Sequence, residues 1–205
     1  VFFRLALRII KDFKLETRRI HFDTTTVTFS GNYATSNVEP RITFGYNKDH
    51  RPDLKQLVFG LNVTADGAVP LLHHVWSGNR TDDSVHRRNT DDLRHLLGRD
   101  DFVYVADGKL CTADNLQAIA EYGGKFVTIL PRTRREDARF RDKLRQQPAR
   151  WRTLLKIPSR RRRDEPPDRY SMCAGAATTD DGYRLIWVRS SQKARLDAQV
   201  RLDEI

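Results

Sequence analysis

The order of its β-type and helical segments is the sequence feature that most constrains how this chain can fold. Runs rich in Val, Phe, Leu and Thr are typical of strands and cover 20–29, 57–64, 69–76, 102–106 and 125–130. Helical patterns cover 82–97 and 113–122. The turn sequence over 65–68 predicts a hairpin between the second and third strand-like runs. We therefore expect an α/β fold in which antiparallel strands precede alternating helices and strands.

This order is the layout of a ribonuclease H-like domain, in which helices flank a mixed sheet. Outside that layout we expect a helix over 1–16 and a long polar loop over 31–56, of a length that is usually functional or disordered. After Pro131 the sequence becomes highly charged. It predicts a helix, a group of strands and a final helix, which cover 132–150, 151–157, 169–176, 183–189 and 191–205. The last third therefore predicts a β-rich insertion near the C-terminus.

Two aspartates lie where an apolar β run breaks or ends. Asp23 lies inside the first strand-like run, and Asp107 follows the fourth. These two strands are neighbours in the ribonuclease H-like layout, so we expect the carboxylates to meet. Carboxylates among β-branched and aromatic residues lose solvation, and two of them repel each other unless a cation lies between them. The pair predicts a site for Mg²⁺, which proteins bind through one or two carboxylates together with substrate phosphates.

The charge of the chain points to a polyanionic partner. Lys and Arg number 37 against 27 Asp and Glu, which leaves a net charge of +10. A nucleic acid is the substrate that best fits both this charge and a phosphate-binding cation. The two cysteines have no short spacing, which excludes a disulfide scaffold and a zinc knuckle. With no signal peptide and no apolar run of about 18 residues, we expect a cytoplasmic protein without membrane contact.

Four blocks of sequence carry a family resemblance. They are His21-Phe22-Asp23-Thr24-Thr25, Gly45-Tyr46-Asn47-Lys48-Asp49-His50-Arg51-Pro52-Asp53-Leu54-Lys55-Gln56, Ser77-Gly78-Asn79-Arg80-Thr81-Asp82 and Val105-Ala106-Asp107. Together they resemble the catalytic core of IS4-like DDE transposases, particularly the IS1634-type branch. The second block is the most specific, and the resemblance runs from about residue 18 to the end of the chain.

The resemblance implies an enzyme that cuts a DNA strand with water and then joins the freed 3′-OH to target DNA. Two Mg²⁺ or Mn²⁺ ions can serve both displacements. Asp23 would bridge the two ions, and Asp107 would hold one of them. The implied partners are double-stranded DNA, as the terminal repeats of the element and as target, and a second copy in a homodimeric synaptic complex. The implied setting is the nucleoid of a bacterial cell.

The third metal ligand of the family is a glutamate on a helix after an insertion domain, and we expect it beyond Ile205. The chain then divides into an N-terminal helical remnant, the first part of the catalytic core, a β-rich insertion and the start of a truncated helix. Their ranges are 1–19, 20–131, 132–190 and 191–205. The alternative is a catalytically inactive, DNA-binding remnant of a transposase. A host nuclease of the same fold is a further alternative, against which the twelve-residue block argues.

Two basic groups are predicted to contact DNA, and each has a simpler interpretation. They are Lys48, His50, Arg51 and Lys55 in the long loop, and Arg160, Arg161, Arg162 and Arg163 near the C-terminus. Either group could be solvated surface charge. The aspartates have structural alternatives too: Asp23 could bond neighbouring Thr hydroxyls, and Asp107 could cap a helix. Adjacent His73 and His74 should point to opposite faces of a strand.

Overall fold

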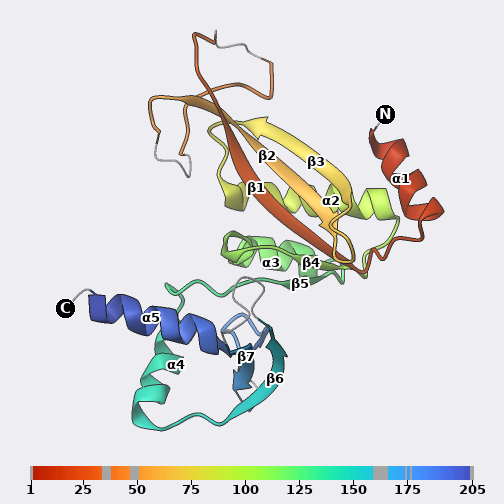
Figure 1. Cartoon of the computed structure of the whole chain (residues 1–205). Coiled ribbons are helices and arrows are strands. Elements are labelled where there is room, and N and C mark those ends of the chain that lie inside the picture. Colours follow the sequence, from red (N-terminus) through yellow and green to blue (C-terminus); the bar gives the residue numbers. More distant parts are fainter. Residues whose placement is uncertain are drawn as a thin grey trace. The chain divides into compact units, whose positions relative to one another are not determined.

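The computed structural model describes residues 2–33, 38–46, 51–158, 166–173, 175 and 177–203. The chain forms two compact units, Val1–Pro131 and Arg132–Ile205. Figure 1 shows the first unit as a twisted sheet with helices and the second as a smaller group of strands with two helices. No helix in the described parts is long and apolar enough to cross a membrane.

The first unit contains the strands and helices expected from the sequence, with ends that differ by a few residues. Its strands are β1 (Arg19–Phe29), β2 (Lys55–Thr64), β3 (Pro70–Ser77), β4 (Val103–Val105) and β5 (Lys125–Val127). Its helices are α1 (Phe2–Asp12), α2 (His86–Leu97) and α3 (Ala113–Ala120), with 3₁₀ turns η1 (Asp82–Val85) and η2 (Gly108–Leu110). The expected helix over 82–97 thus begins as a 3₁₀ turn.

The five strands form one mixed sheet in the order β3-β2-β1-β4-β5. β2 pairs antiparallel with β1 and with β3, which confirms the hairpin. β4 pairs parallel with both β1 and β5. The order and directions are consistent with the ribonuclease H-like layout expected from the sequence.

The alternation of side chains along β1 decides which residues enter the core. Ile20, Phe22 and Thr24 are buried, whereas His21 and Asp23 are exposed on the other face. The ring of Phe22 packs against three rings, those of Trp76, His86 and Tyr104. This packing holds Phe22 in the core and therefore directs the next residue, Asp23, away from it.

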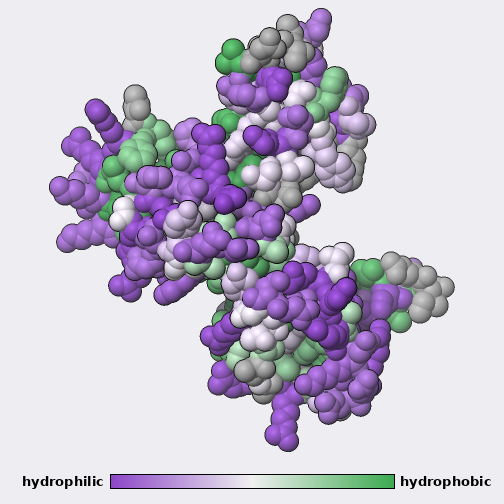
Figure 2. Space-filling view, turned by 180° about the vertical axis from the view of Figure 1, so that it is seen from behind, coloured by the Kyte–Doolittle hydropathy of each residue, from purple (hydrophilic) through white to green (hydrophobic). Residues whose placement is uncertain are grey.

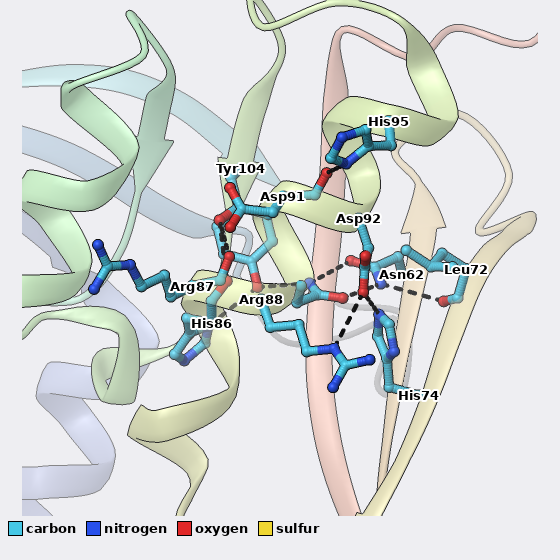
Figure 3. A network of polar contacts seen from close by, with 12 residues as sticks. Asn62, Leu72, His74, His86, Arg87, Arg88, Asp91, Asp92, His95 and Tyr104 are labelled. Carbon is cyan, nitrogen blue, oxygen red and sulfur yellow. Dashed lines mark hydrogen bonds and ion pairs between the residues drawn. The ribbon is translucent and has the colours of Figure 1, made fainter.

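A buried polar network attaches α2 to the sheet (Figure 3). The Asn62 amide donates to Asn89 Oδ1 at 2.7 Å, and the Asn89 amide donates both to Asn62 Oδ1 and to the Tyr104 hydroxyl, each at 2.9 Å. The Tyr104 oxygen also lies 3.0 Å from His86 Nδ1. Burial raises the pKa of Tyr104 well above 10, so its hydroxyl stays protonated. Satisfied buried networks of this kind favour one arrangement of helix on sheet.

The ends of the helices in the first unit are capped in different ways. Thr81 makes no side-chain capping bond at the start of η1. Gly98 ends α2 in the left-handed conformation, with φ 63°, and its N–H donates to the Arg94 carbonyl. Thr112 caps α3 by accepting from the Asn115 N–H.

The segment 38–46, expected to be part of an open loop, is tied to the end of the sheet. Thr43 and Gln56 exchange both backbone hydrogen bonds, at 3.2 and 2.8 Å. The Gln56 side-chain amide donates to the carbonyls of Tyr46 and Gly78, at 3.1 and 2.8 Å. Gly45 and Gly78 lie so close that a Cβ on Gly45 would stand 1.9 Å from the Gly78 oxygen. Two blocks that are separate in sequence therefore form one clamp, which we define as Gly45, Gln56 and Gly78.

The second unit is built from short strands and two helices. Its elements are α4 (Arg135–Gln146), β6 (Trp151–Ile157), β7 (Asp168–Cys173), β8 (Ala177–Thr178), β9 (Arg184–Leu185), β10 (Val188–Ser190) and α5 (Ser191–Asp203). They form a three-stranded sheet, β10-β7-β6, and a β8–β9 pair. The expected strand over 183–189 is divided, because β9 pairs with β8 while β10 pairs with β7.

Hydrogen bonds to Asp168 fix the start of α5. Its carboxylate accepts from the Gln192 N–H at 2.9 Å and from the hydroxyls of Ser190 and Ser191. Burial acts to raise the pKa of Asp168, but these bonds outweigh it and lower that pKa to about 2. Phe140 of α4 stacks on Trp187, with the ring centroids 4.0 Å apart.

Glu136 links α4 to the β8–β9 turn and makes the second unit sensitive to acid. Arg134 donates to its carboxylate at 2.8 Å, the Asp180 N–H donates at 3.0 Å, and these bonds lower the pKa of Glu136 to about 2. The side chain is only 4% exposed. Because its pKa is lowered, the ionised Glu136 carboxylate contributes to the free energy of unfolding above pH 4.5, and this contribution is lost as the pH falls through 2.

We expect Glu136→Gln to lose this contribution to the free energy of unfolding already at neutral pH. The variant should therefore show a flatter acid unfolding profile between pH 4.5 and 2.

Fluorescence of Trp151 and Trp187, both in the second unit, is the measurement for this prediction. Asp142→Asn is the control, because the Asp142–Arg145 pair is exposed and exposed pairs contribute little to stability. An acid profile identical in Glu136→Gln and the unmodified chain would contradict the prediction.

Candidate active site

The sheet places Asp23 and Asp107 at corresponding positions on adjacent strands. The β1–β4 pairing includes His21 opposite Val105, and the two aspartates each follow two residues later. Neighbouring strands lie about 4.8 Å apart, and residues two apart share a face. Both carboxylates are therefore carried on the same face, at the edge where β4 passes into η2.

Both aspartates are exposed, which corrects the expectation that they are embedded among apolar residues. Their apolar neighbours, Phe22 and Ala106, point to the opposite face and are buried there. The expected loss of solvation therefore does not apply to either carboxylate. Any requirement for a cation between the two carboxylates therefore rests only on their placement beside each other on neighbouring parts of the sheet.

Each carboxylate is oriented by one backbone N–H. Asp23 Oδ1 accepts from the Thr24 N–H at 2.8 Å, not from a Thr hydroxyl. Asp107 Oδ1 accepts from the Lys109 N–H at 3.0 Å and so caps η2. The Asp107 carbonyl accepts from the Thr128 hydroxyl of the segment after β5. The capping role anticipated for Asp107 is thus present, and it leaves the second carboxylate oxygen available.

The residues present fit a divalent cation held by two carboxylates. Within the parts of the chain that the structure describes, neither Asp23 nor Asp107 forms an ion pair, and Oδ2 of each accepts no hydrogen bond. Other exposed aspartates, such as Asp53 and Asp101, are each bound by an arginine. Among the described residues, however, no group of three His, Cys, Asp or Glu side chains could hold a metal ion. The two carboxylates thus offer oxygen atoms of the hard type that Mg²⁺ prefers.

The predicted DNA-contact residues are only partly described. Lys48, His50 and Arg160, Arg161, Arg162 and Arg163 lie outside the described residues. Arg51 is bound bidentately by Asp53, at 2.6 and 2.8 Å, so that Asp53 orients the guanidinium group. Lys55 Nζ donates to the Tyr33 carbonyl and lies 5.7 Å from the centroid of the Phe44 ring.

His73 and His74 do point to opposite faces. The His73 ring meets Phe2 edge-on and stacks on Phe59. His74 Nε2 lies 3.5 Å from Asp92 of α2 (Figure 3). Burial lowers the pKa of His74 and Asp92 offsets part of that effect, so the ring is neutral at pH 7.

Sequence reasoning missed Phe44 as a surface residue. Its ring is 54% exposed, and Tyr46, two residues later, is 85% exposed. The sequence signal for this exposure was the alternation Phe44-Gly45-Tyr46, because in extended backbone the middle residue of such a triplet faces the opposite side from the two rings.

Hydrophilic residues cover most of the surface seen in Figure 2, with hydrophobic patches between them.

Comparison with solved structures finds transposases at low sequence identity and with TM-scores below 0.5. No protein-family model matches the chain, and no curated protein matches its sequence. A Mos1 transposase paired-end complex is 10% identical over 61% of this chain and 39% of that chain, with a TM-score of 0.36. A piggyBac transposase synaptic complex with hairpin DNA is 8% identical over 83% and 32%, with a TM-score of 0.48. A Mos1 catalytic domain with Raltegravir and Mg is 11% identical over 71% and 70%, with a TM-score of 0.34.

All three similar structures are of transposases. The chain spans about two fifths of the Mos1 chain in the paired-end complex and a third of the piggyBac chain. At these identities the likeness concerns the fold alone.

Proposed function

We propose that this chain is part of the catalytic core of a bacterial insertion-sequence transposase that cleaves and joins DNA strands with Mg²⁺ or Mn²⁺. The observation that carries the proposal is the pair Asp23 and Asp107, which each follow by two residues a paired position of β1 and β4, and each of which has a carboxylate oxygen that no described residue contacts. The net charge of +10 suits a DNA substrate. The proposed partners are the terminal repeats, target DNA and a second copy of the chain, in the bacterial nucleoid.

In this proposal Asp23 and Asp107 hold the metal ions through their free oxygens. When bound, two divalent ions would activate the attacking water or 3′-OH and stabilise the leaving oxygen of the cleaved phosphodiester. The chain's own contribution is to orient the carboxylates through the N–H groups of Thr24 and Lys109. A third acidic ligand would come from a residue beyond Ile205, as the family resemblance implies.

The proposal is tested by titrating Mn²⁺ into the chain in a calorimeter and by measuring DNA binding with and without the metal. We expect saturable Mn²⁺ binding by the chain. Binding of duplex DNA without Mn²⁺ binding would overturn the catalytic proposal and favour the alternative, a non-catalytic DNA-binding remnant.

A further inference from the structure

An aromatic and basic surface lies at the end of the sheet, and among its residues only Lys55 has been assigned a role above. Its residues are Phe44, Tyr46 and Lys55, which we call the aromatic platform. Phe44 and Tyr46 are 54% and 85% exposed. Lys55 extends its ammonium over the Phe44 ring, and no carboxylate among the described residues lies within ion-pair distance of it. Exposed rings beside an unneutralised cation are costly to hydrate and suit a ligand with both π-faces and negative charge.

The clamp holds this platform in place. Gly45, between the two rings, is pressed against the Gly78 carbonyl, and Gln56, which is fully buried, bonds the Tyr46 carbonyl. Thr43, just before Phe44, is joined to Gln56 by two backbone hydrogen bonds. The backbone on both sides of the rings is therefore fixed to the sheet. A rigid aromatic surface binds a flat ligand without a large loss of conformational entropy.

Lys55 of the platform lies on the same face of the sheet as Asp23. Lys55 is paired with Phe29, and Leu61 with Asp23, and these positions are an even number of residues apart on each strand. Phe29 lies six residues after Asp23 along β1. At a rise of about 3.4 Å per residue this is about 20 Å along the strand. In duplex DNA each strand advances about 3.4 Å per nucleotide, so duplex leading from the metal site to the platform would span about six nucleotides.

We propose that the aromatic platform binds unpaired DNA bases, about six nucleotides from the phosphate held at Asp23 and Asp107. The rings of Phe44 and Tyr46 stack on the bases, and Lys55 contacts the adjoining phosphate. Unpaired bases are favoured over a duplex, because the bases of a duplex already stack on one another and do not offer their faces. This inference rests on the proposed function for its distance from the cleaved phosphate, but the binding itself is independent of metal and of catalysis.

The experiment measures fluorescence anisotropy of a labelled oligothymidylate and of a blunt duplex, both in EDTA. Base–aromatic stacking contributes about 1–3 kcal/mol per base, so Phe44→Ala and Tyr46→Ala should each weaken oligothymidylate binding by at least about fivefold. Duplex binding should change less than twofold. Lys55→Gln should lower the slope of log affinity against log salt by about one unit for the single strand.

Phe13→Ala is the matched control, because Phe13 is 74% exposed in the same unit and lies outside the platform. It should leave both affinities unchanged, and urea unfolding should show that all variants are folded. The inference is overturned if the unmodified chain does not bind oligothymidylate, or if the platform variants affect both DNA forms equally or neither. Mn²⁺ titration of the same variants separates the two hypotheses. Retained Mn²⁺ binding with unchanged oligothymidylate binding would reject the platform alone, and absent Mn²⁺ binding would reject the proposed metal site.

Discussion

Asp23→Asn and Asp107→Asn are each expected to abolish Mn²⁺ binding by this chain. An amide keeps the shape of the carboxylate and can still accept from the Thr24 or Lys109 N–H. It lacks the negative charge that a hard divalent cation requires. Because both side chains are exposed, the free energy of unfolding should change by less than about 0.5 kcal/mol.

Calorimetric Mn²⁺ titration beside urea unfolding checks this expectation. Asp114→Asn is the control, because Asp114 is an exposed aspartate at the start of α3 and is not a member of the proposed pair. Loss of binding in both site variants but not in the control would place the two carboxylates at one metal site. If both site variants bind Mn²⁺ as the unmodified chain does, Asp23 and Asp107 are structural residues.

Gly78→Ala is expected to destabilise the first unit by about 3 kcal/mol. A Cβ at this position would lie 2.1 Å from the Gln56 carbonyl oxygen and 2.5 Å from that of Thr43. Both atoms belong to backbone that is hydrogen-bonded within the clamp, so neither can move without breaking those bonds. The clamp would open, and segment 38–46 would separate from the end of β2.

Urea unfolding monitored by Trp76, the tryptophan of this unit, measures the effect. Gly67→Ala is the matched control, because its new Cβ would meet only Val69 at the ordinary distance of 3.7 Å. The control should change the free energy of unfolding by less than about 0.5 kcal/mol. Equal stability of the two variants would show that the clamp does not hold the segment in solution.

The hairpin and the α/β order of the first unit could be predicted from the sequence, because the residues that determine them lie close together in the chain. Alternating apolar residues over 20–29, a glycine-containing turn over 65–68 and the stop at Gly98 each act within a few residues. Pairing Asp23 with Asp107 required knowledge of the ribonuclease H-like layout, since 83 intervening positions separate them. The expectation that both aspartates are embedded among apolar residues was wrong, because local composition does not say which face of a strand is covered.

By itself, then, the sequence determined the elements, the excess of positive charge and the two aspartates that can serve as metal ligands. The tertiary structure alone decided that both aspartates are exposed. It also joined Gly45, Gln56 and Gly78 into a clamp and presented Phe44 and Tyr46 beside Lys55. The physical reason is that exposure and close backbone approach depend on contacts between residues far apart in the chain. Periodicity and turn propensity report only on near neighbours.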